Sequence, residues 1–229
     1  MSLQDWAGYD SLHDINHDEQ EPYVLPIILR LEKDENLKPS HEEAQIATAH
    51  AIVKFFDSDE IIENGEWRPE VDKWLNGRIR KVARRARGAE WGAVKQLPHV
   101  FATYGKAEVI ILPPHPNFAP PAEIKKLQIS GMDLERKSSE YLESLKNVLV
   151  FSENPDISFT TGKSLAQVGH AVQLAIFNSS EEDMSSWVTA GMKIAIAPWD
   201  SFDGVEIHDA GFTEILAGSL TAKGLLSGR

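Results

Sequence analysis

The chain has 229 residues, of which 42% are hydrophobic and 25% are charged, and its formal net charge is −12. This balance supports a buried core and excludes a wholly disordered protein, while the absence of cysteine excludes disulfides, thiolate metal sites and cysteine nucleophiles. The apolar runs are far shorter than the roughly 18 residues of a membrane span, and the sequence shows no secretory signal. We therefore expect a cytoplasmic protein that does not enter a membrane.

The first 22 residues contain six acidic residues and neither lysine nor arginine. We interpret residues 1–22 as an acidic flexible leader. Two histidines within it, His13 and His17, are each followed by an aspartate, a spacing that suits a metal ion. Ordering a flexible segment on binding costs entropy, so we expect a solvated tail and no metal.

The first predicted strand, Val24–Leu31, is a continuous apolar run in which Pro26 indicates an edge position or a strand start. A helix follows, because Ser40 can cap its first turn and Glu43, three residues later, completes a capping box. Apolar residues recur along one face of this helix until it ends near Asp57.

A basic island lies between Lys73 and Lys95, where eight basic residues and one acidic residue give a charge of +7 against −19 for the rest of the chain. The apolar residues of this region gather on one arc at helical spacing, which predicts a helix from about Pro69 to Val94 with a uniformly basic outer face. A solvated surface and a face that binds a polyanion are equally good interpretations of it. The residues that would bind are Arg78, Arg80, Lys81, Arg84, Arg85 and Arg87.

The remaining elements alternate between strands and helices. We expect strands at Ala107–Leu112, Asn147–Phe151, Met192–Ala197 and Val205–His208, a proline-rich extended connector from 113 to 121, and a helix at Ser164–Phe177. This alternation predicts an α/β fold or an α+β sandwich.

Candidate chemistry collects in the last third of the chain. Gly162–Ser164 (Gly-Lys-Ser) suggests a nucleotide-binding loop, but the glycine that a P-loop requires five residues earlier is Ile157, which excludes such a loop. Lys163 still lies at the amino end of a predicted helix, where free N–H groups, the helix dipole and the lysine charge together attract anions. Asp209 enters an Ala-Gly turn after a strand, where an aspartate commonly bonds backbone N–H groups.

Two spaced motifs carry a family resemblance. The first comprises Gly162, Lys163, Ala166, Gln167, His170 and Ala171. The second comprises Asp209, Ala210, Gly211, Thr213, Ile215, Gly218, Ser219 and Thr221. Together they resemble the signature of type II peptidyl-tRNA hydrolases, the archaeal and eukaryotic class, over residues 147–225.

The resemblance implies an enzyme that hydrolyses the ester between a peptide and the terminal ribose of tRNA, without a metal or other cofactor. It implies that the catalytic residues are Lys163, Asp209, Thr213 and Thr221. Asp209 would orient or deprotonate the attacking water, Lys163 and the helix N-terminus would stabilise the developing oxyanion or a nearby phosphate, and both threonines would position water and ribose. The residues expected to support or pack behind them are Gln167, His170 and Ser219.

The sequence departs from the family pattern at two places. The lysines that commonly precede the family's Gly-Lys are replaced by Ser158 and Thr161, and the segment 199–204 is too short for the helix that precedes its Asp-Ala-Gly. A non-catalytic RNA- or protein-binding relative is therefore the alternative function. A generic small-ester hydrolase is a third option, for which Gly218-Ser219 does not supply the required Gly-x-Ser-x-Gly elbow.

The first half of the chain matches the second in outline. Val24–Leu31 and the helix after it align with Asn147–Phe151 and its own following helix. In this alignment the counterparts are His41 for Lys163, Thr48 for His170, and 105–111 for 191–194.

We therefore expect an α/β fold in which a mixed four-stranded sheet sandwiched by helices occurs twice in tandem. Residues 23–145 would form a degenerate unit that contains the basic helix, and 146–229 the catalytic unit; two unrelated α/β units with a chance match are the alternative. The pair would act as a monomeric pseudo-dimer or as a homodimer, and the basic helix would bind tRNA phosphates.

Overall fold

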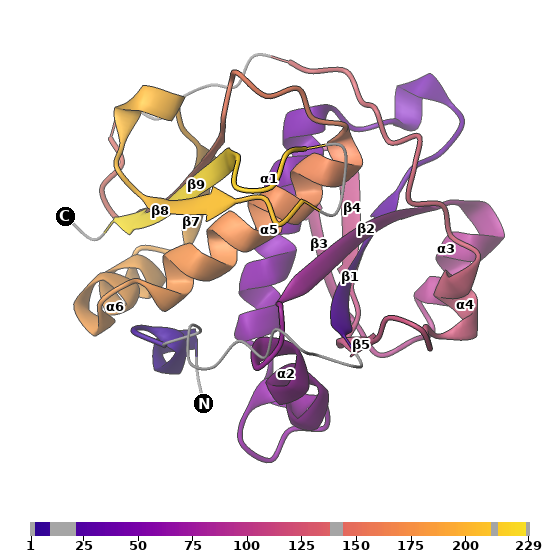
Figure 1. Ribbon diagram of the computed structural model, residues 1–229, viewed down its shortest axis with the longest axis horizontal. Coiled ribbons are helices and arrows are strands. Elements are labelled where there is room, and N and C mark those ends of the chain that lie inside the picture. Colours follow the sequence, from indigo (N-terminus) through magenta and orange to yellow (C-terminus); the bar gives the residue numbers. More distant parts are fainter. Residues whose placement is uncertain (1–2, 10–21, 138–143, 212–214, 228–229) are drawn as a thin grey trace.

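The computed structural model describes residues 3–9, 22–137, 144–211 and 215–227, which build two β-sheets with helices between and outside them (Figure 1). The first sheet has the strand order β2-β1-β4-β3 and the second β7-β6-β9-β8, and the short β5 pairs with β1. The strands are β1 (Tyr23–Arg30), β2 (Arg80–Ala86), β3 (Val100–Tyr104), β4 (Ala107–Ile111), β5 (His115–Pro116), β6 (Val148–Glu153), β7 (Lys193–Ile196), β8 (Val205–His208) and β9 (Leu220–Ser227). The helices are α1 (His41–Phe56), α2 (Arg68–Leu75), α3 (Gly88–Val94), α4 (Ala122–Lys125), α5 (Thr161–Phe177) and α6 (Glu181–Thr189).

The two sheets repeat one topology, which confirms the predicted fold of two tandem mixed α/β units. In each, the first strand pairs in parallel with the strand that follows two helices (β2 or β7) and antiparallel with β4 or β9. Trp74 and Trp187 also repeat, because each indole N–H donates to the backbone carbonyl six residues further on, at 2.8 and 2.7 Å. The residue before that carbonyl, Ile79 or Met192, has a φ of 47° or 53° and turns the chain into the strand.

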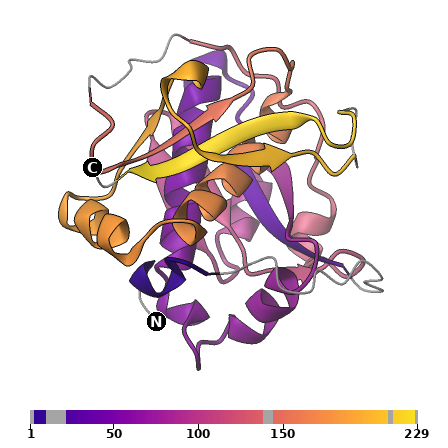
Figure 2. The ribbon, with the colours of Figure 1, turned by 60° about the vertical axis from the view of Figure 1, so that its left-hand side comes forward.

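Helices α1 and α5 lie side by side between the two sheets (Figures 1 and 2). They run in the same direction, because His41 contacts Thr161 at their first turns and Phe56 contacts Phe177 at their last. Buried residues of both helices and of the inner face of each sheet form one continuous hydrophobic core. The two units therefore share their interior.

The helix caps set the register between the two units. Ser40 caps α1 by accepting the N–H of Glu43, which confirms the predicted capping box, and Thr160 caps α5 by accepting the N–H of Lys163. Lys163 therefore corresponds to Glu43. The predicted alignment superimposed Ala44-Gln45 on Ala166-Gln167 and so paired Lys163 with His41 and His170 with Thr48. It is wrong by two residues.

The segment 105–111, expected to match 191–194, has a different counterpart. Its strand β4 pairs antiparallel with β1, as β9 does with β6. The segment 191–194 instead leads into β7, the parallel partner of β6, whose counterpart is β2. Gly105-Lys106 and Gly191-Met192-Lys193 therefore precede strands that pair with the first strand of their units in opposite directions.

The basic region 69–94 is not a single helix, contrary to the prediction. It comprises α2, the strand β2 and α3. Helix α2 ends at Leu75, Ile79 takes a left-handed conformation that a helix interior does not accommodate, and Gly88, with a φ of 50°, begins the next helix. Burial largely alternates along β2 where it pairs with β1, so the apolar residues that fitted a helical arc also fit the period of a strand.

Strand β1 lies inside its sheet, so the position predicted from Pro26 is wrong. On the side away from β2, β5 pairs with Tyr23 and Val24, and β4 pairs from Ile27 onward, leaving Pro26 between them. The missing N–H of proline is tolerated at this break between two neighbours. Its carbonyl accepts the N–H of Leu112 at 3.3 Å.

Part of the expected leader is packed against the core. Leu3–Trp6 form a 3₁₀ helix in which Leu3 and Trp6 are almost fully buried. The Trp6 indole donates to the carbonyl of Phe56 at 3.0 Å and stacks on Phe177, with 5.5 Å between ring centroids. The prediction of a flexible leader is therefore wrong for residues 3–9, whereas both histidines of that segment lie outside the described residues.

The outer faces of the two sheets are covered differently. Trp91 of α3 and Ile124 of α4 pack on the outer face of the first sheet. On the second sheet, Phe202 packs there, directly after the 3₁₀ helix Trp199–Ser201. As predicted, the segment 199–204 contains no helix of the length found in the family. Its 3₁₀ turn and Phe202 cover this part of the sheet instead.

Candidate active site

Lys163 and Asp209 meet at one edge of the second sheet. Thr160 caps α5 and places Lys163 in its first turn, and Asp209 directly follows β8. The Lys163 ammonium contacts Asp209 Oδ2, and the two side chains are 12% and 3% exposed. Two residues 46 positions apart thus form one largely buried ion pair.

Asp209 is held by its side chain and its backbone. Its Oδ1 accepts the N–H of Gly211 at 2.8 Å, and its Oδ2 accepts the side-chain amide of Gln167 at 3.0 Å as well as the ammonium. Its own N–H donates to the Ser219 carbonyl at 2.9 Å, and its carbonyl accepts the Gly218 N–H at 2.8 Å, which closes the loop between 209 and 218. The carboxylate is therefore fixed in orientation.

The geometry of the turn explains why the third residue of the Asp-Ala-Gly motif is glycine. Gly211 has a φ of 79°, a conformation that residues with a Cβ rarely adopt. A Cβ built there would also lie 2.7 Å from the Cβ of Ala217. Only glycine therefore turns the chain tightly enough to present its N–H to Asp209.

Thr221 joins this cluster from β9. Ile207 pairs with Ala222 and His208 with Leu220, so Thr221 is the extra residue of a bulge in β9, a feature that re-aims a side chain. Thr221 is fully buried, and its Oγ1 lies 2.8 Å from Gln167 Oε1 and 2.9 Å from the Ile207 carbonyl. Gln167, expected only to support the site, links Thr221 to Asp209 directly.

Two other predicted site residues contribute less to this geometry. Ser219 is adjacent through its backbone carbonyl, which accepts from Asp209. Thr213 lies outside the described residues, so its catalytic role stays a prediction.

The first turn of α5 is closed to an anion. The Gly162 N–H donates to the Met132 carbonyl at 3.4 Å, and the Lys163 N–H donates to the side chain of the capping residue at 3.3 Å. Leu134 of the same connector donates its N–H to Thr161 Oγ1 at 3.0 Å. The N–H groups of Gly162 and Lys163 are therefore already engaged and do not support the expected contribution to an oxyanion, and the positive charge here is that of the Lys163 side chain.

His170 contacts the first unit. Its Nδ1 lies 3.1 Å from Lys81 Nζ, which also donates to the Gln173 side chain and lies 5.0 Å from the ring centre of Trp74. Burial lowers the pKa of both Lys81 and His170 well below their ordinary values, and the charges of Lys81 and Lys163 lower the pKa of His170 further. Because Lys81 is 8% exposed, its predicted contact with tRNA is wrong, and it forms a buried link between the units instead.

The other predicted tRNA-binding residues do not share one face. The strand period places Arg80 and Arg84 on one side of β2 and Arg85 on the other. Arg84 and Arg85 donate to carbonyls of the segment 127–130, at 3.2 and 3.1 Å. The exposed members are Arg78 and Arg87, which flank the strand.

The first unit lacks the equivalent cluster. Glu43 stands in the place of Lys163, and the turn after β3, the counterpart of β8, begins with Gly105 in the place of Asp209. Glu43 accepts the Lys106 N–H at 3.3 Å, and a Cβ at Gly105 would lie 2.1 Å from Glu43 Oε1. An aspartate at this place would displace the Glu43 side chain and would have to adopt a φ of 54°, which residues with a Cβ rarely do.

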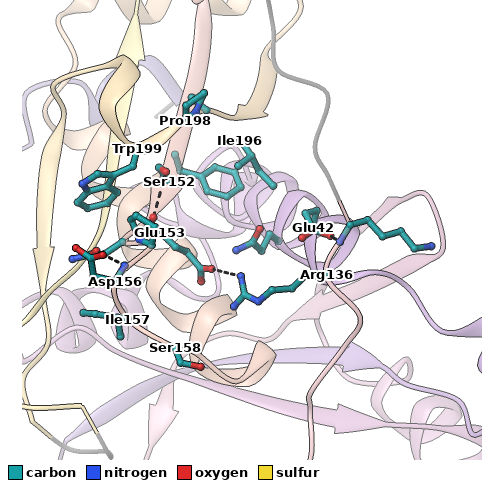
Figure 3. Close-up of a pocket in the computed structure, with 16 residues that line it drawn as sticks. Glu42, Arg136, Ser152, Glu153, Asp156, Ile157, Ser158, Ile196, Pro198 and Trp199 are labelled. Atoms are coloured by element: carbon teal, nitrogen blue, oxygen red, sulfur yellow. Dashed lines mark hydrogen bonds and ion pairs between the residues drawn. The ribbon is translucent and has the colours of Figure 1, made fainter.

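Sequence reasoning missed a second polar cluster, where the two units meet. His41 lies 3.0 Å from Thr161 Oγ1 through Nδ1, and 3.3 Å from Glu153 Oε2 and 3.2 Å from Ser164 Oγ through Nε2. Because the serine and the carboxylate contact the same ring nitrogen, the three residues do not form a nucleophile–base–acid relay. Glu153 ends β6 and lines a cavity of about 630 Å³ (Figure 3). The one signal of this cluster in the sequence is Glu153 itself, a charged residue at the end of an apolar strand.

Two kinds of site are absent from the part of the chain that the structure describes. No group of three or more His, Asp or Glu side chains there is placed to hold a metal ion. No helix there is both long and apolar enough to cross a bilayer.

Comparison of the chain with protein-family models, with curated proteins and with solved structures found no match.

Proposed function

We propose that this chain hydrolyses the ester bond of peptidyl-tRNA, releasing the peptide and freeing the tRNA. The observation that supports the proposal is the hydrogen-bonded cluster of Lys163, Gln167, Asp209 and Thr221. These residues come from both family-like motifs. A chance likeness in sequence gives no reason for the matched residues of two separate motifs to bond one another.

In the proposed mechanism, Asp209 orients or deprotonates the attacking water. A carboxylate offers about four acceptor positions. Lys163, Gln167 and Gly211 occupy three of them, which leaves one on Oδ1 for water. Lys163 is the more exposed partner of the ion pair, so it can turn its ammonium toward the developing oxyanion while Gln167 holds Asp209. Thr221 holds Gln167 and thereby positions Asp209.

The second candidate is a non-catalytic RNA- or protein-binding relative with the same fold. The closed first turn of α5 favours it, because the backbone N–H groups there do not assist an oxyanion. The replacement of the preceding family lysines by Ser158 and Thr161 favours it as well.

Release of the acyl group from N-acetyl-aminoacyl-tRNA separates the two candidates. The variants are Lys163→Ala and Asp209→Ala, and Lys193→Ala removes an exposed lysine of β7 as a control. We expect both site variants to lose at least about 100-fold in rate and the control to keep the wild-type rate. Comparable release by all of them would end the enzyme proposal, and a folded wild type that binds tRNA without releasing the acyl group would establish the second candidate.

We propose that tRNA contacts the exposed arginines that flank β2. Phosphate contacts are independent of sequence and weaken with salt. Arg78→Glu combined with Arg87→Glu should raise KM at low salt and leave kcat near the wild-type value, whereas Lys193→Glu should change neither. An unchanged KM for the double variant would exclude this surface.

The repeat also bears on assembly. One chain already carries two similar units around a shared core, so we propose that it acts as a monomeric pseudo-dimer in the cytoplasm, where its substrate is produced. Sedimentation of the chain as a homodimer at low concentration would contradict this assignment.

A further inference from the structure

The cavity in Figure 3 lies at the carboxyl ends of the parallel strands β6 and β7. This edge is where α/β sheets commonly bind ligands, and about 630 Å³ is within the range of small-molecule sites. The cavity is separate from the cluster around Asp209, and its walls include the residues that follow both strands, from Asn154 to Ser158 and from Ala197 to Trp199.

The buried carboxylate of Glu153 has fewer partners than such a group needs. Its side chain is 10% exposed, and Oε1 is buried without a hydrogen-bond partner in the described structure. Oε2 has long contacts, 3.3 Å to His41 Nε2 and 3.4 Å to Arg136 Nη1, and Ser164 also interacts with the carboxylate. Burial raises the pKa of Glu153, but His41, Ser164 and Arg136 lower it by more, so its pKa is below the ordinary value. A buried ionised carboxylate with vacant acceptor positions favours a cationic donor.

Arg136 covers this carboxylate only loosely. Its side chain is 52% exposed, and its second contact, from Nη2 to the Phe159 carbonyl, is 3.3 Å. Half-exposed ion pairs of this length contribute little. A guanidinium thus already stands at the mouth of the site and can be displaced by another.

The rest of the wall suits the stem of such a ligand. The apolar part of the lining comprises Phe151, Ile157, Ile196, Pro198 and Trp199. Figure 3 labels the last four of these together with Glu153. Apolar walls beside one buried carboxylate match an aliphatic chain that ends in a planar, bidentate donor, the pattern of an arginine side chain. We propose that this cavity binds an arginine side chain of a peptide, with Glu153 holding the guanidinium in the place of Arg136.

Isothermal titration with N-acetyl-arginine amide tests this site, with N-acetyl-citrulline amide as the neutral isostere. Arg136→Ala should tighten binding of the arginine probe about threefold, because it removes the competing guanidinium. Lys137→Ala, which removes the same charge from an exposed neighbour, should not. Glu153→Gln should weaken binding about tenfold or more, while Asp156→Asn, an exposed carboxylate of the same wall, should leave it nearly unchanged.

Three results would overturn the proposal: no heat with the arginine probe for wild type and Arg136→Ala at tens of millimolar, equal binding of the citrulline probe, or weaker binding after Arg136→Ala. The last result would indicate an anion site. If Glu153→Gln does not fold, as judged by circular dichroism, the probe comparison and the two cation variants still decide the question. The titration uses no tRNA, so its outcome is independent of the proposed hydrolysis.

Discussion

Replacing Lys81 with methionine probes the buried link between the two units. Methionine keeps much of the side-chain length beside Gly169, where Lys81 Cδ lies close to the α5 backbone. The change removes an ammonium that is 8% exposed and that contacts His170, Gln173 and the Trp74 ring. The effect on stability is therefore the balance between a lost desolvation penalty and lost polar contacts.

The magnitude follows from those two contributions. Replacing a buried charged group with a well-packed apolar one commonly stabilises by about 1–4 kcal/mol. Against this, Gln173 loses the donor to its Oε1 while its Nε2 is already without a partner, which costs about 1 kcal/mol. We therefore expect Lys81→Met to stabilise the protein at pH 7 by about 0–3 kcal/mol.

The dependence on pH is the sharper observable. Because the pKa of Lys81 in the folded state is well below 10.5, the unfolded chain binds more protons than the folded one at any pH between that lowered pKa and 10.5. The wild type therefore gains stability as the pH rises toward 10.5, by up to about 1.4 kcal/mol per pH unit. The advantage of Lys81→Met should shrink by the same amount over that range.

Urea unfolding at several pH values between 7 and 10 measures this difference. The control is Lys73→Met, because the Lys73 side chain is 56% exposed and belongs to the same basic island. Its stability difference from wild type should not vary with pH. If the difference between wild type and Lys81→Met were equally constant, Lys81 would be charged in the folded state and the assignment of a desolvated lysine would be refuted.

Three further changes test other parts of the account. Trp6→Ala should lower the free energy of unfolding, measured by chemical denaturation, by about 3–5 kcal/mol. A loss below about 1 kcal/mol would indicate that residues 3–9 form a flexible leader, as the sequence predicted. Gly211→Ala should reduce both ester hydrolysis and stability. Gly191 has a similar positive φ but open space where a Cβ would lie, so Gly191→Ala should reduce only stability. Equal activity of the two variants would show that the tight turn at Gly211 is not needed for hydrolysis. Thr221→Val should lower kcat and destabilise by about 1–3 kcal/mol, because Gln167 Oε1 loses its donor, and a wild-type kcat would exclude that chain of contacts.

The predicted elements that the structure confirms are those with strong local signals. The capping box at Ser40 and Glu43 fixes the start of α1, and the predicted strand Val205–His208 has the bounds of β8. Local signals also revealed that the chain contains two similar units. They did not set the register between the units, because the Ala-Gln dipeptides repeat without being structurally equivalent.

The basic island shows why the remaining elements were harder to predict. From Arg80 to Ala86 the apolar residues fit both a helical arc and a strand, and the partner that selects the strand, β1, lies more than 50 residues earlier. The breaks at Gly77 and Gly88 were the available local signals. The burial of Lys81 could not be predicted from β2 alone, since His170 and Gln173 belong to the other unit.

The candidate site was more accessible to sequence reasoning than its surroundings. The residues of the two motifs are bonded to one another, including the Lys163–Asp209 pair. The closure of the first turn of α5 by Met132 and Leu134 has no sequence signal, because the connector contacts the helix end through backbone groups and one threonine hydroxyl. The deficit of partners around Glu153 likewise exists only in three dimensions.

A single-turnover comparison of wild type with Asp209→Asn tests the central claim most directly. The substitution preserves the size of the side chain and removes the charge that pairs with Lys163. With N-acetyl-aminoacyl-tRNA bound at saturation, the wild type should release the acyl group well above the spontaneous rate, and Asp209→Asn should be slower by at least about 100-fold. Release by the folded variant at the wild-type rate would show that the carboxylate at this sheet edge does not perform the hydrolysis.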